Sequence, residues 1–244
     1  MVFSPIFALF LFPAMVLLLE LGRRVRIRRK VEAGNAAIEG TVFALFGLLL
    51  AFTFSGAMTR YDAHRNLIVE ETNNIGTAYR RLDLLPTNSQ PGMRQLFREY
   101  ATSRLHLYDT VAPEISAESL RLQDVIWQQA VQDCSAPGAN PDATKLLLPA
   151  LNSMFDITAI RQNVFNMHPP AIVYLLLFVL SLWCAFMAGC SMSGIERNGL
   201  YIVGFALAVT LTIYATLEIE YPRRGLIRLI QTDQSLVHLR DSMK

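Results

Sequence analysis

The chain has 244 residues, of which 52% are hydrophobic and 17% are charged, and its formal net charge is +2. A soluble domain carries about 25% charged residues. The composition therefore excludes an ordinary soluble protein and predicts an integral membrane protein with a moderate extramembrane part. The small net charge indicates no nucleic-acid partner.

The first predicted membrane span covers residues 3–21 and is interrupted by Pro13 and Glu20. It lacks a charged start, and no small-residue cleavage site follows it, so we expect a retained helix rather than a signal peptide. A short basic loop comes next, which sets the membrane topology or binds anionic lipids; both interpretations stay open. Its basic residues are Arg23, Arg24, Arg26, Arg28, Arg29 and Lys30.

The second predicted span covers residues 38–58, and Glu39 is its one charged residue. Small residues recur along it every three or four positions, which puts them on one face of a helix. Small residues at this spacing let another helix approach closely in lipid. We therefore expect this stripe to contact protein helices, in the same subunit or in the next one. The stripe consists of Gly40, Ala44, Gly47, Ala51 and Ser55.

Beyond residue 58 the pattern changes without a break into a polar heptad helix that ends before Pro86. This one helix is therefore predicted to leave the bilayer and to enter an extramembrane domain. Three more helices are expected there, at residues 93–111, 117–132 and 142–166, with Ser116 and Asp142 as N-caps of the last two. The third and fourth spans are predicted at residues 171–190 and 199–217.

These elements predict an all-α fold, a four-helix transmembrane protein with a stalk-like helical domain inserted between spans 2 and 3. The expected parts are residues 1–58 with spans 1 and 2, residues 59–168 with the extramembrane helical domain, residues 169–217 with spans 3 and 4, and a tail at residues 218–244.

Two charged residues interrupt the apolar stripes of the helices that enter and leave the extramembrane domain. These helices should pair antiparallel, and counting back from the two membrane exits brings Glu71 within about one turn of Arg161. An unpaired charge at such a position would be costly. We therefore predict that Glu71 and Arg161 form an ion pair in the stalk.

The side of the membrane is predicted from the basic first loop. Positive charge in short loops favours the cytoplasm, so the termini and the helical domain should lie outside it. Arg223, Arg224 and Arg228 in the tail argue for the opposite orientation, and so, less strongly, do Arg60 and Arg65.

Nothing in the sequence is typical of an enzyme. There is no nucleophile motif and no glycine-rich phosphate loop, and the histidines and cysteines show no metal-ligand spacing. We therefore predict no catalytic residue, no metal site and no cofactor.

Two interpretations of the second span stay open. One is tight helix packing through the small-residue stripe. In the other, several copies of this helix line a pore, and a ring of apolar side chains forms a constriction that gates by dewetting. The candidate neck residues are Phe43, Phe46, Leu50 and Phe54. Four spans make a thin bundle, so both interpretations favour a homo-oligomer.

Several segments resemble a bacterial membrane family of uncharacterised function named bestrophin-like. They are AIEGTVFALFGLLLAFTFSG at residues 37–56, RYDAHR at residues 60–65, Glu70 with Glu71, NIGTAY at residues 74–79 and RLDLLP at residues 81–86. The resemblance covers most of the chain.

The name of this family implies kinship with bestrophins, which are pentameric anion channels with a helical cytosolic domain between two pairs of spans and a hydrophobic neck on span 2. Phe46, Leu50 and Phe54 stand where that neck would fall. Two features depart from the bestrophin pattern: the orientation that the basic loop predicts, and the lack of an acidic cluster resembling the calcium clasp of animal bestrophins.

The leading hypothesis is a homo-oligomeric, multi-pass protein of the bacterial inner membrane that acts as a bestrophin-like anion channel. Its partners would be the lipid bilayer, further copies of itself and small anions. The alternative is a non-conducting scaffold or sensor whose helical domain binds a protein partner.

Overall fold

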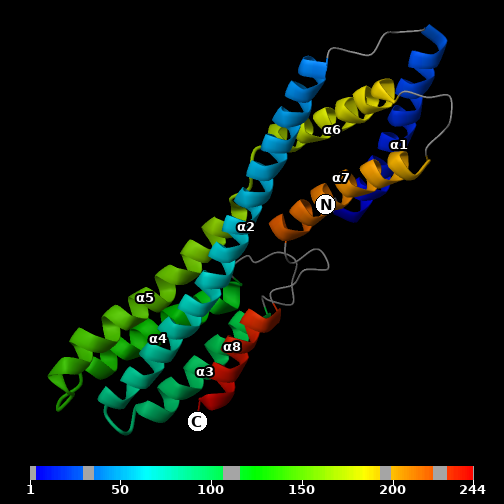
Figure 1. Cartoon of the computed structure of the whole chain (residues 1–244). Coiled ribbons are helices and arrows are strands. Elements are labelled where there is room, and N and C mark those ends of the chain that lie inside the picture. The colour runs from blue at the N-terminus through cyan, green and yellow to red at the C-terminus, as the bar shows by residue number, and fades with distance from the viewer. Residues whose placement is uncertain (1–3, 30–35, 107–115, 193–198, 222–229, 244) are drawn as a thin grey trace. The chain divides into compact units, whose positions relative to one another are not determined.

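The computed structural model describes residues 4–29, 36–106, 116–192, 199–221 and 230–243. This part of the chain is helical, with short turns and no strand (Figure 1). The elements are α1 (Ser4–Arg29), α2 (Ala36–Arg81), the short 3₁₀ helix η1 (Leu82–Leu84), α3 (Gln90–His106), α4 (Ala117–Cys134), α5 (Pro141–Asn166), α6 (Ala171–Ser191), α7 (Gly199–Glu220) and α8 (Ile230–Ser242).

The chain forms two compact units. Unit 1 comprises Met1–Tyr61 and His168–Ile227, and unit 2 comprises Asp62–Met167 and Arg228–Lys244. The helix α2 contributes its first part to unit 1 and its second part to unit 2. The predicted passage of one helix from an apolar segment into a polar heptad segment therefore corresponds to a single helix of 46 residues.

Unit 1 contains the apolar helices. Among the described residues, α2, α6 and α7 are long and apolar enough to cross a membrane. The helix α1 packs against both α6 and α7. Leu11, Met15 and Leu19 of α1 are fully buried, because they recur every four residues and form one face of this helix.

The contact between α1 and α6 depends on two glycines. A β-carbon on Gly22 would overlap the carbonyl oxygen of Phe186, and one on Gly189 would overlap the carbonyl oxygen of Leu19. The two backbones therefore touch where neither residue has a side chain. This is the packing that small residues permit in apolar helix pairs.

Unit 2 is a helical bundle with its own apolar core, built from the second part of α2 with α3, α4, α5 and α8. The heptad stripe of α2 faces this core, since Ile75, Ala78 and Leu82 are fully buried. Asn74 donates to the carbonyl oxygen of Ser153, and Arg81 donates to that of Leu146. Rising numbers on α2 thus meet falling numbers on α5, so the two helices are antiparallel.

Two helices of unit 2 begin at or near residues for which the sequence predicts an N-cap. Ser116 caps α4 as expected, because its hydroxyl accepts from the backbone N–H of Ser119 at 3.0 Å. The cap of α5 is Asn140 rather than Asp142, and its side chain accepts from the backbone N–H of Asp142. Pro141 occupies the first turn, where a missing N–H costs nothing. The helix therefore begins before Asp142, at Pro141.

The C-terminal helix α8 is part of unit 2. Leu236 and Met243 are buried in the core of this unit, and Leu239 packs against it. The hydroxyls of Thr72 and Ser235 lie 3.3 Å apart.

Replacing Gly189 by alanine should destabilise unit 1. The added methyl group has no free space between the α1 and α6 backbones, and overpacking of this kind costs about 1–3 kcal/mol. Thermal unfolding of the detergent-solubilised protein measures the effect.

Gly204→Ala in α7 is the matched control, because nothing lies within 4 Å of a β-carbon built on Gly204. Alanine there should leave stability unchanged or raise it by up to about 1 kcal/mol through helix propensity. Equal melting temperatures for the two variants would contradict the proposed backbone contact.

Candidate functional site

The apolar segment of α2 is the first candidate site, and one side of it is closed by the chain itself. Phe46 is only 6% exposed and lies in the core of unit 1. Phe43 and Leu50 pack against the same core, and the Phe43 ring meets the Phe205 ring edge-on at 6.4 Å. Phe54 is the exposed member of the predicted neck, with 39% of its surface accessible.

The four predicted neck residues therefore do not share one free face of a protomer. Phe43, Phe46 and Leu50 pack toward the unit 1 core, whereas Phe54 lies at the edge of that face. The sequence could not reveal which side of α2 faces the core of unit 1, because both sides of the helix are apolar.

The small-residue stripe points away from the core of unit 1. Gly40, Ala44, Gly47, Ala51 and Ser55 are all exposed. In the described part of the chain, no atom beyond the helix's own backbone lies within 4 Å of a β-carbon built on Gly40 or Gly47. The close approach that Gly22 and Gly189 make within this chain is therefore not made by this stripe.

A polar cluster in unit 1 joins α2 to the end of α7. Arg60 donates from Nε and Nη2 to the Glu220 carboxylate, at 2.8 Å and 2.7 Å. The Glu220 side chain is 1% exposed, and the Arg60 side chain is 28% exposed. His168 Nδ1 lies 3.3 Å from the same carboxylate, and its ring stands 4.8 Å from that of Tyr221.

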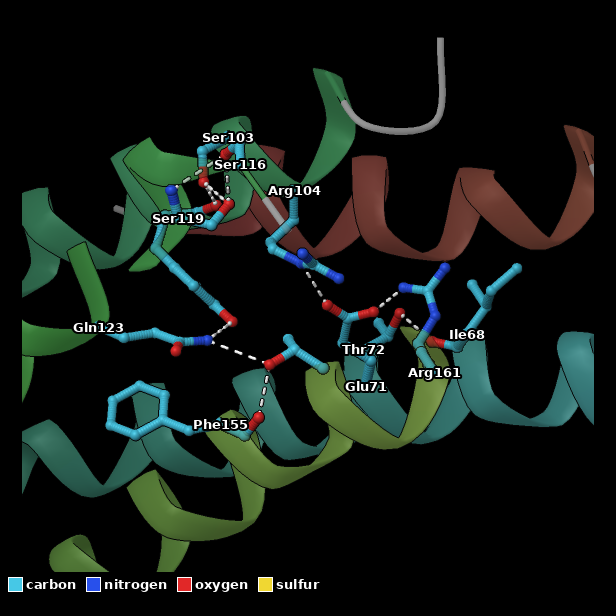
Figure 2. Close-up of polar contacts among 12 residues, drawn as sticks. Ile68, Glu71, Thr72, Ser103, Arg104, Ser116, Ser119, Gln123, Phe155 and Arg161 are labelled. Carbon is cyan, nitrogen blue, oxygen red and sulfur yellow. Dashed lines mark hydrogen bonds and ion pairs between the residues drawn. The ribbon is translucent and has the colours of Figure 1, made fainter. Parts of the chain in front are cut away.

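A second polar cluster lies in unit 2, and we call Glu71, Arg104 and Arg161 the Glu71 cluster (Figure 2). Glu71 has no exposed surface. Arg161 forms the ion pair with Glu71 that the sequence predicts. Arg104 Nε donates to the other carboxylate oxygen, Oε1, at 2.6 Å.

Sequence reasoning missed Arg104, although a signal was present. It follows Tyr100 by four positions and so lies on the buried face of α3, where Phe97 and Tyr100 are fully buried. A charged residue on such a face needs a partner. The contact between Arg60 and Glu220 had no comparable signal, because the two residues are far apart in the chain and follow no shared periodicity.

The basic segment that the sequence predicts as a loop belongs, up to Arg29, to the C-terminal part of α1, and its side chains are partly engaged within unit 1. Arg23 and Arg24 both donate to Glu20 of the same helix, and Arg26 donates to the carbonyl oxygen of Cys190 at 2.9 Å. Arg28 is exposed. The Arg29 side chain and Lys30 lie outside the described residues.

Within the described ranges, no group of three His, Cys, Asp or Glu side chains is arranged to hold a metal ion. Burial raises the pKa of the Cys134 thiol, which disfavours the reactive thiolate.

Comparison with known proteins identifies the architecture. A protein-family model described as "Bestrophin-like domain" matches residues 7–232. No curated protein matches the chain.

Solved structures resemble the whole chain. A single-substitution variant of a bacterial bestrophin homolog from Klebsiella pneumoniae has a TM-score of 0.75 and 15% identity, covering 97% of this chain and 99% of that one. Another variant of that homolog has a TM-score of 0.77 and 12% identity, covering 98% of each chain. A structure described as a membrane protein has a TM-score of 0.73 and 14% identity, covering 96% and 98%. At these identities the likeness concerns the fold.

Removing Glu71 alone should destabilise unit 2 more than removing it together with its partners. Glu71→Ala leaves two guanidinium groups without their shared carboxylate, and breaking a buried pair in this way costs about 3–5 kcal/mol. The triple variant Glu71→Leu, Arg104→Met, Arg161→Met should lose less, because no charge stays behind. A mutant cycle by thermal unfolding measures the coupling. Additive losses across the cycle would show that the three side chains do not interact.

Proposed function

Because this chain belongs to the bestrophin-like family, we propose that it is a multi-pass membrane protein that assembles from identical subunits and conducts small anions. Its partners in this proposal are the lipid bilayer, further copies of the chain and the permeant anion. The observation that carries the proposal is the face of α2 on which the small-residue stripe lies exposed.

The number of spans in this proposal is four. The helices α2, α6 and α7 meet the length and hydropathy of a span by themselves. We assign α1 as the remaining span because its buried Leu11, Met15 and Leu19 pack in the same core as α6 and α7. Four spans from one chain cannot enclose an aqueous pathway of useful width, which favours an oligomer.

The small-residue stripe supports the assembly of several α2 helices around one axis. Exposed glycine and alanine gain little from lipid, whereas they allow close packing between helices or leave room for a hydrated pathway. We therefore assign this stripe to contacts between copies or to the pathway wall.

We assign the hydrophobic constriction to Phe54. Its side chain is exposed beside the stripe, and Phe46 and Leu50 support that side of the helix from within unit 1. A ring of phenylalanine side chains excludes water unless the helices move apart, and this gates conduction by dewetting.

The alternative is a non-conducting membrane scaffold or sensor whose helical domain binds a protein. One observation favours it: unit 2 exposes large apolar side chains. Leu120 and Val131 of α4 are 47% and 38% exposed, and Leu146 and Ile160 of α5 are 42% and 47% exposed. Such residues are typical of protein contacts when they gather in one patch.

We propose the bacterial inner membrane as the location, with unit 2 and the termini outside the cytoplasm. The basic residues of the first loop support this orientation through the positive-inside rule. The layout implied by bestrophins supports the opposite orientation.

Conduction can be tested with purified protein in planar bilayers. We expect anion currents that Phe54→Ala increases several-fold, because a smaller side chain widens and wets the constriction. Phe52→Ala is the matched control: it is 68% exposed but lies about 160° away around α2, and it should leave the currents unchanged. The absence of current at all voltages and with all anions tested would support the alternative of a non-conducting scaffold or sensor.

The orientation can be tested with a topology reporter joined to Lys244 through a flexible Gly/Ser linker. The linker is needed because Met243 is 5% exposed and belongs to the core of unit 2. We expect the signal of a reporter outside the cytoplasm. A cytoplasmic signal would contradict the orientation and agree with that of bestrophins.

A further inference from the structure

The Glu71 cluster divides one carboxylate between two arginines. Oε1 of Glu71 accepts from Arg104 Nε, and Oε2 is engaged by Arg161. An arginine usually binds a carboxylate through two parallel hydrogen bonds, one to each oxygen. Here the two oxygens serve different arginines, so Arg104 is held through Nε alone.

This arrangement leaves a buried donor of Arg104 unsatisfied. Arg104 is 5% exposed, and no described residue supplies a hydrogen-bond partner for its Nη1 atom. Leaving a buried charged donor without an acceptor costs more than leaving a neutral one.

We propose that the Glu71 cluster is a binding site for a small monovalent anion, which accepts a hydrogen bond from Arg104 Nη1. A guanidinium group stays protonated at any physiological pH, so the unsatisfied donor cannot be removed by loss of a proton. A negatively charged acceptor satisfies it best, because it also neutralises the positive charge that two guanidinium groups leave beside one carboxylate.

The charge of the cluster suits an ion of this kind, because two guanidinium groups face a single carboxylate. Figure 2 shows Arg104 and Arg161 approaching Glu71 from α3 and α5. The Arg161 side chain is 13% exposed, which gives the cluster contact with solvent, whereas Arg104 and Glu71 lie deeper. A halide or a carboxylate of the size of formate carries the required charge.

This site is distinct from the pathway proposed above, because all three side chains belong to unit 2 and Phe54 belongs to unit 1. Its occupation is expected to stabilise the three-way contact of α2, α3 and α5. Binding can therefore be tested by stability, independently of whether the protein conducts.

The test measures the melting temperature of the full-length, detergent-solubilised protein in chloride, with gluconate replacing chloride at constant ionic strength. We expect the melting temperature to rise by about 3–5 °C for each tenfold increase in chloride above the dissociation constant. Formate in a separate series distinguishes a halide site from one that also accepts carboxylates.

Two variants assign the effect to this cluster. Arg104→Gln should abolish the chloride dependence, whereas Arg121→Gln, which removes an arginine paired on the surface with Glu118, should keep it. Because Arg104→Gln is itself destabilising, Glu71→Gln provides a second measurement. It retains both arginines without the competing carboxylate, so it should bind chloride more tightly, and its melting temperature should begin to rise at a lower chloride concentration than that of the unmodified protein.

Bromide gives a direct readout, because its anomalous scattering in crystals locates the ion beside Arg104. Equal melting temperatures in chloride and gluconate for both the unmodified protein and Glu71→Gln would overturn the proposal and assign the Arg104 donor to water. An unaltered chloride dependence in Arg104→Gln would overturn it as well, since the ion would then bind elsewhere.

Discussion

The helix α2 contributes side chains to both hydrophobic cores of this protein, and the rest of the structure depends on this constraint. Phe46 and Leu50 of α2 pack into the core of unit 1, and Ile75 and Ala78 pack into that of unit 2. The helix must therefore carry an apolar surface that suits lipid along one part and a heptad stripe with a polar outer face along the other. Each remaining helix has to match only one of these two environments.

Both units hold buried charge against α2, and in both the partner is brought from a distant part of the chain. Arg60 meets Glu220, and Glu71 meets Arg104 and Arg161. A well-packed apolar contact would often be at least as stabilising as a buried ion pair. Charged groups add selectivity instead, because a shifted helix register would leave each of them without a partner. The two clusters thus favour one pairing of α2 with its neighbours within each unit.

The sequence predicts those features that one element carries alone. The passage of α2 from apolar to heptad pattern, the Ser116 cap and the buried face with Ile75 and Leu82 all follow from local spacing. The pairing of Glu71 with Arg161 follows from antiparallel counting. The side of α2 that faces the core of unit 1 does not follow from the sequence, because Phe46 and Gly47 are both compatible with a core, with lipid or with another subunit. Asn140 takes the cap expected of Asp142 because the proline between them moves the start of α5.

The burial of Leu236 and Met243 in unit 2 has a consequence for biosynthesis. The helices α3, α4 and α5 are synthesised early, yet the core they share with α8 lacks Leu236 and Met243 until α8 and the residue that follows it have been synthesised. Both α6 and α7 are synthesised in the interval. The apolar helices α6 and α7 are therefore synthesised before unit 2 can reach its final packing, and the core of this unit is incomplete during that interval.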